Sequence, residues 1–515
     1  MKSQGQKLKT LFIILLLLGG PAAQAFQVSD NLTVSSKNRT WSHKSSNGLT
    51  STELEYRGEI VFTDDDRDVK SISDGGFLKF SQRSFGVKRT IILEGNSGGR
   101  IGREYYEGRT ELPFEPDGRK WMEDVLIEII RSTGIGAEQR VARFYKKGGM
   151  NAVIEEIDEI SSDYVQSKYF GHAVNYPGIK TSEIQLVTIS AADMISSSYE
   201  LAKFFISGSK TFLKDNETAN IFLENTAEIS SDYEQARVLK HVIKEYDITD
   251  ANAAVIIKGT KNISSDYEQA RVLLSLMEKD LSKQNLKLVQ MAMENISSSY
   301  EKSRILKYLI EKQEPTTENV MFIINASSQI SSDYEQAKVL QMLLTEEIEI
   351  AALAEVAKAT QEISSDYEQS KVLQAIAIQK ALTAEVVDII VQASLNISSD
   401  YEQTKVLKKM LESDKLTSES LETILEAASE ISSSSEKSKL LQSVIDKGDL
   451  ENAEIEAILN AAEDISSSYD KSKVLQAVGP KIAKDNLELR ELFRQVAKTI
   501  SSDHDFGKAM RSLDN

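Results

Sequence analysis

The sequence predicts a mainly α protein: an α-solenoid of about eleven two-helix repeats of 34 residues, preceded by a small antiparallel β domain. The first observation behind this fold class is the phrase Ile-Ser-Ser, which returns every 33 to 35 residues. The second is a Gly- and Ser-rich stretch with alternating apolar residues that precedes the repeats. The third is composition, because 41% hydrophobic residues in a chain of 515 can fill a folded core. This composition argues against wholesale disorder.

The first 25 residues have the pattern of a signal peptide. A basic start precedes an unbroken apolar run over 11–18, and Ala23-Gln24-Ala25 is typical of a cleavage site. Because the run is too short to span a bilayer comfortably, we expect cleavage and no transmembrane anchor. Cleavage would remove three lysines and change the net charge from −18 to −21. Residues 1–25 are predicted as the signal peptide of an exported protein, periplasmic or extracellular.

Residues 26–116 are predicted to form the small β domain. Alternating apolar residues indicate strands over 54–62, 77–80 and 88–93, and Gly95 to Gly99 is typical of a hairpin loop.

An N-terminal helical cap is predicted over 117–159. One apolar helical face runs over 121–130, and a degenerate repeat copy over 134–144 ends at a Lys-Lys-Gly-Gly break. The α-solenoid repeats are then predicted over 160–515.

Eleven copies of the repeat define the solenoid. In the copy that begins at Ile263, Ser265 is the expected N-cap of a helix and Glu268 completes a capping box. The preceding helix of each repeat is expected to begin after a Ser or Thr N-cap, and examples are Thr249, Ser282, Thr383 and Thr417. Two short amphipathic helices cannot bury their apolar faces alone, so neighbouring repeats must stack. The copies begin at Ile160, Ile195, Ile229, Ile263, Ile296, Ile330, Ile363, Ile397, Ile431, Ile465 and Ile500.

Three columns of the repeat are nearly invariant, and two of them, positions four and eight, carry the candidate binding residues. Counting the Ile as zero, position four is Tyr in nine copies, position five is acidic in ten, and position eight is basic in all eleven. Position seven is small throughout, which permits close approach of neighbouring helices. The predicted partner-binding residues are Tyr233, Tyr267, Tyr300, Tyr334, Tyr367, Tyr401, Arg237, Arg271, Arg304, Lys338 and Lys371.

Two interpretations of these columns stay open. In the structural one, Tyr packs on the adjacent repeat while base and acid pair within or between repeats, since charged columns are usually solvated faces. In the functional one, the columns form a binding stripe, because Tyr and Arg supply many hot spots at protein interfaces and solenoids present extended surfaces.

Composition and motifs argue against an enzyme. The chain has no Cys and is strongly acidic, which excludes thiolate chemistry and disfavours a nucleic-acid partner. Gly95 to Gly99 matches G-x-S-x-G but lacks the strand–turn–helix context of a nucleophile. Asp64 to Asp68 resembles a calcium loop without its Gly and Glu, so a solvated turn is the better interpretation. The four His are scattered. No catalytic residue, cofactor or metal is predicted.

A known bacterial arrangement resembles part of this chain. The resemblance lies in 59–66, 69–73, 133–141 and the Ile-Ser-Ser-Asp-Tyr phrase at 160–164. It is to uncharacterised extracytoplasmic regions of bacterial proteins, some of them fused to membrane metallopeptidases of the β-lactam sensor-transducer type. The resemblance implies no established activity, and no catalytic residue is carried over because the peptidase motif H-E-x-x-H is missing. The period equals that of tetratricopeptide repeats without their Trp, Gly and Pro pattern, so HEAT-like stacking is the closer analogy.

The first functional hypothesis is an exported, non-enzymatic scaffold that binds a protein or peptide along its solenoid surface. The alternative is an envelope- or ligand-sensing module in which the N-terminal β domain performs recognition. Association with the envelope and the oligomeric state stay open.

Overall fold

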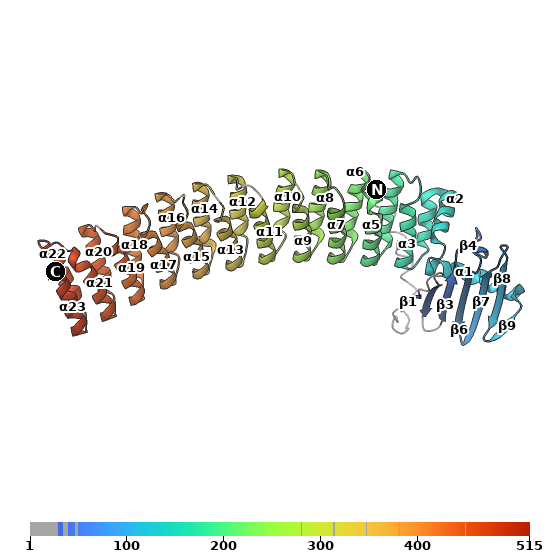
Figure 1. Ribbon diagram of the computed structural model, residues 1–515, viewed down its shortest axis with the longest axis horizontal. Coiled ribbons are helices and arrows are strands. Elements are labelled where there is room, and N and C mark those ends of the chain that lie inside the picture. Colours follow the sequence, from blue (N-terminus) through green and yellow to red (C-terminus); the bar gives the residue numbers. More distant parts are fainter. Residues whose placement is uncertain are drawn as a thin grey trace, which may run out of the picture. The chain divides into compact units, whose positions relative to one another are not determined.

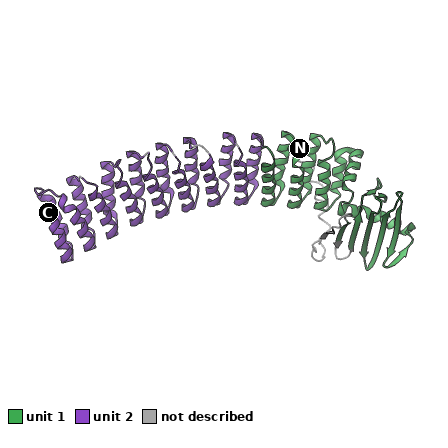
Figure 2. Ribbon diagram, viewed as in Figure 1, with its two compact units in different colours: residues 1–247 green, residues 248–515 purple. Residues whose placement is uncertain are grey.

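The computed structural model describes residues 29–33, 40–46 and 50–514, apart from 280, 313–314, 347, 381 and 449. The predicted signal peptide, residues 1–25, lies outside the described residues. The chain divides into two compact units, 1–247 and 248–515, and each is described by itself (Figure 2). Stacked helix pairs follow an N-terminal antiparallel sheet, which confirms the predicted fold class, an α-solenoid with a small β domain.

Unit 1 begins with an antiparallel sheet of seven described strands in the order β1-β2-β3-β6-β7-β8-β9 (Figure 1). The strands are β1 (Ser29–Thr33), β2 (Thr40–Ser46), β3 (Thr50–Arg57), β6 (Phe77–Ser84), β7 (Val87–Gly95), β8 (Ile101–Glu107) and β9 (Thr110–Leu112). A separate antiparallel hairpin consists of β4 (Ile60–Phe62) and β5 (Val69–Ile72).

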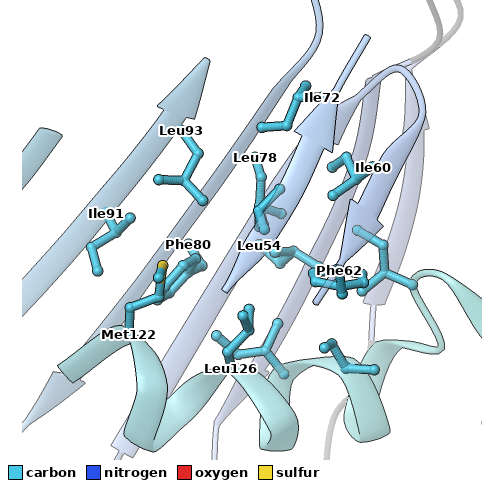
Figure 3. Close-up of a cluster of buried hydrophobic side chains, with 14 of the residues drawn as sticks. Leu54, Ile60, Phe62, Ile72, Leu78, Phe80, Ile91, Leu93, Met122 and Leu126 are labelled. Atoms are coloured by element: carbon cyan, nitrogen blue, oxygen red, sulfur yellow. The ribbon is translucent and has the colours of Figure 1, made fainter. Parts of the chain in front are cut away.

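One face of the sheet is apolar and covered. Leu54, Phe80, Ile91 and Tyr105 lie opposite one another on four adjacent strands and are almost fully buried. Helix α1 (Arg119–Thr133) packs its own apolar residues, Met122 among them, into the same cluster, and the β4–β5 hairpin adds more (Figure 3). The range predicted as a cap, 117–159, thus contains one helix that completes the core of the β domain and a second, α2, that contacts α3.

The predicted strand over 54–62 is two strands in two sheets. Gly58 separates β3 from β4 with a φ of +84°, and a Cβ there would lie 2.2 Å from the Ser73 hydroxyl oxygen. A residue with a side chain fits neither this backbone conformation nor this space. The alternation predicted both segments, and the glycine redirects the chain between them.

Seven α-helices complete the described part of unit 1: α1, α2 (Ala137–Asp158), α3 (Asp163–Val174), α4 (Thr181–Met194), α5 (Ser198–Phe212), α6 (Asn216–Asn225) and α7 (Asp232–Glu245). The predicted break in α2 is confirmed, since Gly148 and Gly149 have non-helical backbone angles inside it. Short turns of other helix types occur in both units at Phe114–Gly118, Thr226–Glu228, Thr260–Asn262, Thr360–Glu362 and Gly479–Lys481.

In unit 2 the helices form two rows, with odd-numbered helices beside odd and even beside even (Figure 1). The odd row is α9 (Asp266–Met277), α11 (Ser299–Lys312), α13 (Asp333–Leu343), α15 (Asp366–Ala377), α17 (Asp400–Leu411), α19 (Ser434–Asp446), α21 (Ser468–Val478) and α23 (Asp503–Asp514). The even row is α8 (Asp250–Gly259), α10 (Lys283–Met293), α12 (Thr317–Ser327), α14 (Ile350–Ala359), α16 (Ala384–Ser394), α18 (Ser418–Glu430), α20 (Asn452–Glu463) and α22 (Leu487–Lys498).

Helix starts follow the repeat phrase. The Ser265 hydroxyl accepts a hydrogen bond from the Glu268 backbone N–H, which confirms it as an N-cap. The Glu268 carboxylate accepts hydrogen bonds from Arg271, so it pairs with a base in the helix where a capping box was expected. In the even row, the predicted N-caps are all confirmed: Thr249, Ser282, Thr383 and Thr417.

Candidate binding surface

The position-four tyrosines lie on one edge of the odd row, each as the second residue of its helix. In unit 2 their side chains are 52–57% exposed, although the apolar residues further along the same helices are buried. We call this set the Tyr ladder: Tyr267, Tyr300, Tyr334, Tyr367, Tyr401 and Tyr469. At Ser435, the second residue of α19, the column is interrupted, and this helix has the same Ser N-cap as its neighbours, Ser433.

Every ring of the Tyr ladder has the position-eight base of its own helix above it. The distances from the cation to the ring centroid are 5.2 Å for Arg271, 5.9 Å for Arg304, 5.4 Å for Lys338, 5.2 Å for Lys371, 5.3 Å for Lys405 and 4.6 Å for Lys473. A cation over an aromatic face is attracted by the ring quadrupole, typically by about 0.5–1 kcal/mol at exposed sites. The base therefore holds the ring in place and leaves part of it exposed.

The position-five acid forms the third column and is mostly buried. Glu268 pairs with Arg271 at 3.1 Å, and Glu301 pairs with Arg304 at 2.7 Å, both three residues apart in one helix. The corresponding Lys371, Lys405 and Lys439 make the same pair. In α13, Glu335 instead accepts a hydrogen bond from the Ser303 hydroxyl of the preceding repeat.

In unit 1 the bases reach the preceding repeat. Arg237 lies 5.4 Å from the ring centroid of Tyr199, and Lys203 lies 5.0 Å from that of Tyr164. Tyr233, another predicted binding residue, is 57% exposed on α7. Arg237 also pairs with Glu234 at 2.8 Å.

Features of both sequence interpretations occur in the same columns. Base and acid pair within a repeat, as the structural interpretation expects. The tyrosines are half exposed, as a binding stripe requires. Packing on the adjacent repeat therefore leaves about half of each ring accessible to a partner.

Sequence reasoning missed the column at position three, which links one repeat to the next. The Asp266 carboxylate accepts hydrogen bonds from the backbone N–H groups of Ser297 (3.1 Å) and Ser298 (2.7 Å) in the following repeat. Asp366 and Asp400 make equivalent links to Ser398, Ser399 and Ser433. Where position three is Ser, its hydroxyl accepts one such bond, as at Ser299, Ser434 and Ser468. The signal was present, because position three is Asp or Ser in all eleven copies.

Position seven provides the close helix contact that its size predicted. Ser370, Ser438 and Ser472 are almost fully buried, and each hydroxyl donates to a backbone carbonyl at position five of the next repeat. A larger side chain would separate the two helices and break this bond.

The Asp64–Asp68 turn is only partly solvated: Asp64, Asp65 and Arg67 are exposed as expected, but the other two carboxylates pair with arginines. Asp66 is buried and pairs with Arg140 and Arg143 of α2. Asp68 pairs with Arg103 and Arg119 at 3.0 and 2.9 Å. Arginines thus occupy two of the four carboxylates that a calcium ion could use in this turn. Within the described residues, no group of three or more His, Cys, Asp or Glu is arranged to hold a metal ion.

Arg140 is the centre of a buried charge network in unit 1. Its guanidinium is 1% exposed and lies 2.8 Å from both Asp66 and Glu156, and it donates to the Tyr169 hydroxyl on α3. Burial alone would raise the pKa of Glu156, but hydrogen bonds from Arg131 and the charge of Arg140 outweigh it and hold that pKa below its usual 4.5. Burial raises the pKa of Tyr169 to about 12. The network ties the β4–β5 hairpin to the first stacked helices.

Acidification is expected to weaken unit 1 through Glu156. The pKa of Glu156 is lower in the folded protein than in the unfolded chain. The ionised carboxylate therefore contributes its full stabilisation above the pKa of the unfolded chain, and this stabilisation is lost as the pH falls through the pKa of the folded protein. Glu156→Gln should therefore lower the free energy of unfolding at neutral pH but flatten its decline towards about pH 3. Urea unfolding followed by tryptophan fluorescence checks this, because Trp41 and Trp121 are the two tryptophans of the chain. Parallel pH profiles for the two proteins would contradict the assignment.

Gly95 to Gly99 forms the predicted hairpin loop. Strands β7 and β8 pair antiparallel on either side of it, and the Asn96 N–H donates to the Arg100 carbonyl. No helix follows this turn, so the context of a nucleophile elbow is missing.

No helix in the described part of the chain has both the length and the apolar character needed to cross a membrane. No protein-family model and no curated protein matches the sequence. The chain is similar to a crystallised engineered protein of the Northeast Structural Genomics Consortium, at 16% identity over 70% of this chain and 99% of that one, with a TM-score of 0.25. It is also similar to a circular tandem repeat protein with novel repeat topology, at 12% identity over 77% and 91%, with a TM-score of 0.15. The resemblance to sensor-type extracytoplasmic regions stays a prediction.

Proposed function

We propose that this protein is an exported, non-enzymatic scaffold that binds a protein or peptide partner along the Tyr ladder. The observation that carries the proposal is the repeated half exposure of Tyr267, Tyr300, Tyr334, Tyr367, Tyr401 and Tyr469, each held under a base. Export rests on the signal-peptide pattern of residues 1–25.

The ladder has the chemistry of an interface hot spot. A Tyr side chain offers a large contact area with few rotatable bonds, and its hydroxyl finds polar partners at little entropic cost. The base over each ring limits its motion before a partner arrives, so less conformational entropy is lost on binding. The Tyr–base unit also recurs in successive helices, which favours an extended segment that contacts several repeats.

Ser435 shows that Tyr is not required for the helix itself. The helix α19 starts on the Ser433 N-cap and runs to Asp446 with Ser at position four. Tyr→Ser is therefore a substitution that the repeat already contains, and it removes the ring without removing a cap.

The test is the variant Tyr267→Ser/Tyr300→Ser/Tyr334→Ser/Tyr367→Ser. We expect it to keep its helical circular-dichroism spectrum, since exposed substitutions usually change stability by about 0.5 kcal/mol or less. Capture by wild-type protein from the native envelope or secreted fraction, with quantitative mass spectrometry, should recover a partner that the variant loses at least about tenfold.

The matched control removes four exposed apolar side chains outside the ladder, with Met291, Ile350, Leu395 and Leu487 changed to Ser. It should recover the same partner as the wild type. If the folded ladder variant recovers that partner equally well, the ladder is not the binding surface.

A further inference from the structure

Unit 1 has an open pocket of about 670 Å³ between strand β4 and the first part of α2. This volume is within the range of small-molecule sites, roughly 300–1,000 Å³. Its apolar wall includes Phe62 of β4 and Phe144 of α2, and its polar wall carries four cationic side chains and one acid, Asp64.

Two of the four cations, Arg140 and Arg143, are held in place by ion pairs with buried acids. Arg140 is held by Asp66 and Glu156, and Arg143 donates to the Thr63 carbonyl and pairs with Asp66. The buried acids thus compensate both guanidinium groups, which form a fixed wall.

The other two cations, Lys146 and Lys147, are exposed, and neither has an acidic partner within the described residues. They lie three and four residues after Arg143, which is the spacing that places side chains on one face of a helix. The pocket therefore presents two uncompensated ammonium groups in a chain whose net charge is −18. An anion there gains charge-assisted hydrogen bonds and meets less repulsion than elsewhere on this surface.

We propose that this pocket binds a small organic anion, a phosphate or carboxylate attached to an aromatic or other apolar group. Lys146 and Lys147 bind the anionic group, and the partly exposed ring of Phe144 contacts the apolar part, beside the edge of the almost fully buried Phe62. Asp64, which is exposed at the pocket, opposes the anion. This site is separate from the Tyr ladder, so each can be tested without the other.

The experiment is calorimetric titration of the full chain with phenyl phosphate. Phenyl phosphate should bind saturably and at least about tenfold more tightly than either phenol or inorganic phosphate, because only it uses both walls. Lys146→Gln/Lys147→Gln should weaken binding at least about tenfold, and Asp64→Asn should tighten it about two- to fivefold by removing the opposing charge.

The matched control is Lys408→Gln/Lys409→Gln, a pair of adjacent lysines in α17 of unit 2, and it should bind as the wild type does. Thermal unfolding by circular dichroism verifies that each variant is folded. The absence of saturable binding, equal affinity for phenol, or unchanged affinity in the folded Lys146→Gln/Lys147→Gln variant would each overturn the proposal.

Discussion

Replacing Arg140 by Ala is expected to destabilise unit 1 by about 3–5 kcal/mol, because removing one partner leaves buried charges unpaired. Asp66 and Glu156 are both nearly buried and both within 2.8 Å of this guanidinium. The Tyr169 hydroxyl on α3 also loses the hydrogen bond that the Arg140 guanidinium donates to it. Urea unfolding followed by tryptophan fluorescence measures the effect, since both tryptophans lie in unit 1.

The matched control for this prediction is Arg89→Ala. Arg89 pairs with Glu107 at 3.1 Å, but its side chain is 47% exposed. An exposed pair typically contributes about 0.2–1 kcal/mol. If the two variants unfold at the same urea concentration, the buried network does not stabilise unit 1 in the way the geometry indicates.

Replacing Asp266, Asp366 and Asp400 together by Ala is expected to destabilise unit 2 by about 3–6 kcal/mol. Each carboxylate accepts backbone N–H groups of the following repeat, and alanine leaves those donors without their acceptor. Stability of a repeat array depends on such contacts between neighbours. Urea unfolding by circular dichroism, with amide hydrogen exchange at Ser298, Ser399 and Ser433, measures the loss.

The matched control replaces the same three residues by Ser. The hydroxyls of Ser299, Ser434 and Ser468 already accept the equivalent bond in other repeats. The Ser variant should therefore lose less than half as much free energy of unfolding as the Ala variant. If the Ser and Ala variants lose the same free energy of unfolding, the hydrogen bond from the following repeat is not the source of the stability that position three provides.

Several features followed directly from the sequence because they depend on neighbours within one helix or turn. An N-cap such as Ser265 needs only the backbone N–H three residues later, and the Gly95–Gly99 turn needs only adjacent strands. Periodicity likewise predicts which side of each helix is buried, since burial follows the 3.6-residue turn.

Other features required the tertiary structure. The sequence shows Asp66 in an acidic turn, and only packing against α2 places Arg140 and Arg143 beside it and removes it from water. Similarly, from the sequence alone the apolar face of α1 could pack on either a sheet or another helix. In the structure it packs on the sheet, where it shares a core with Phe80.

By itself, then, the sequence determined the repeat, its phase, its caps and the small residue between helices, because each depends on local chain geometry repeated eleven times. Only the tertiary structure decided that the tyrosines of the ladder are half exposed under their bases and that Asp266 and its equivalents link neighbouring repeats. The links between repeats join residues more than 30 positions apart, whose approach no local pattern specifies. The Tyr–base contact joins residues only four positions apart, but how much of each ring stays exposed depends on how the neighbouring repeats pack.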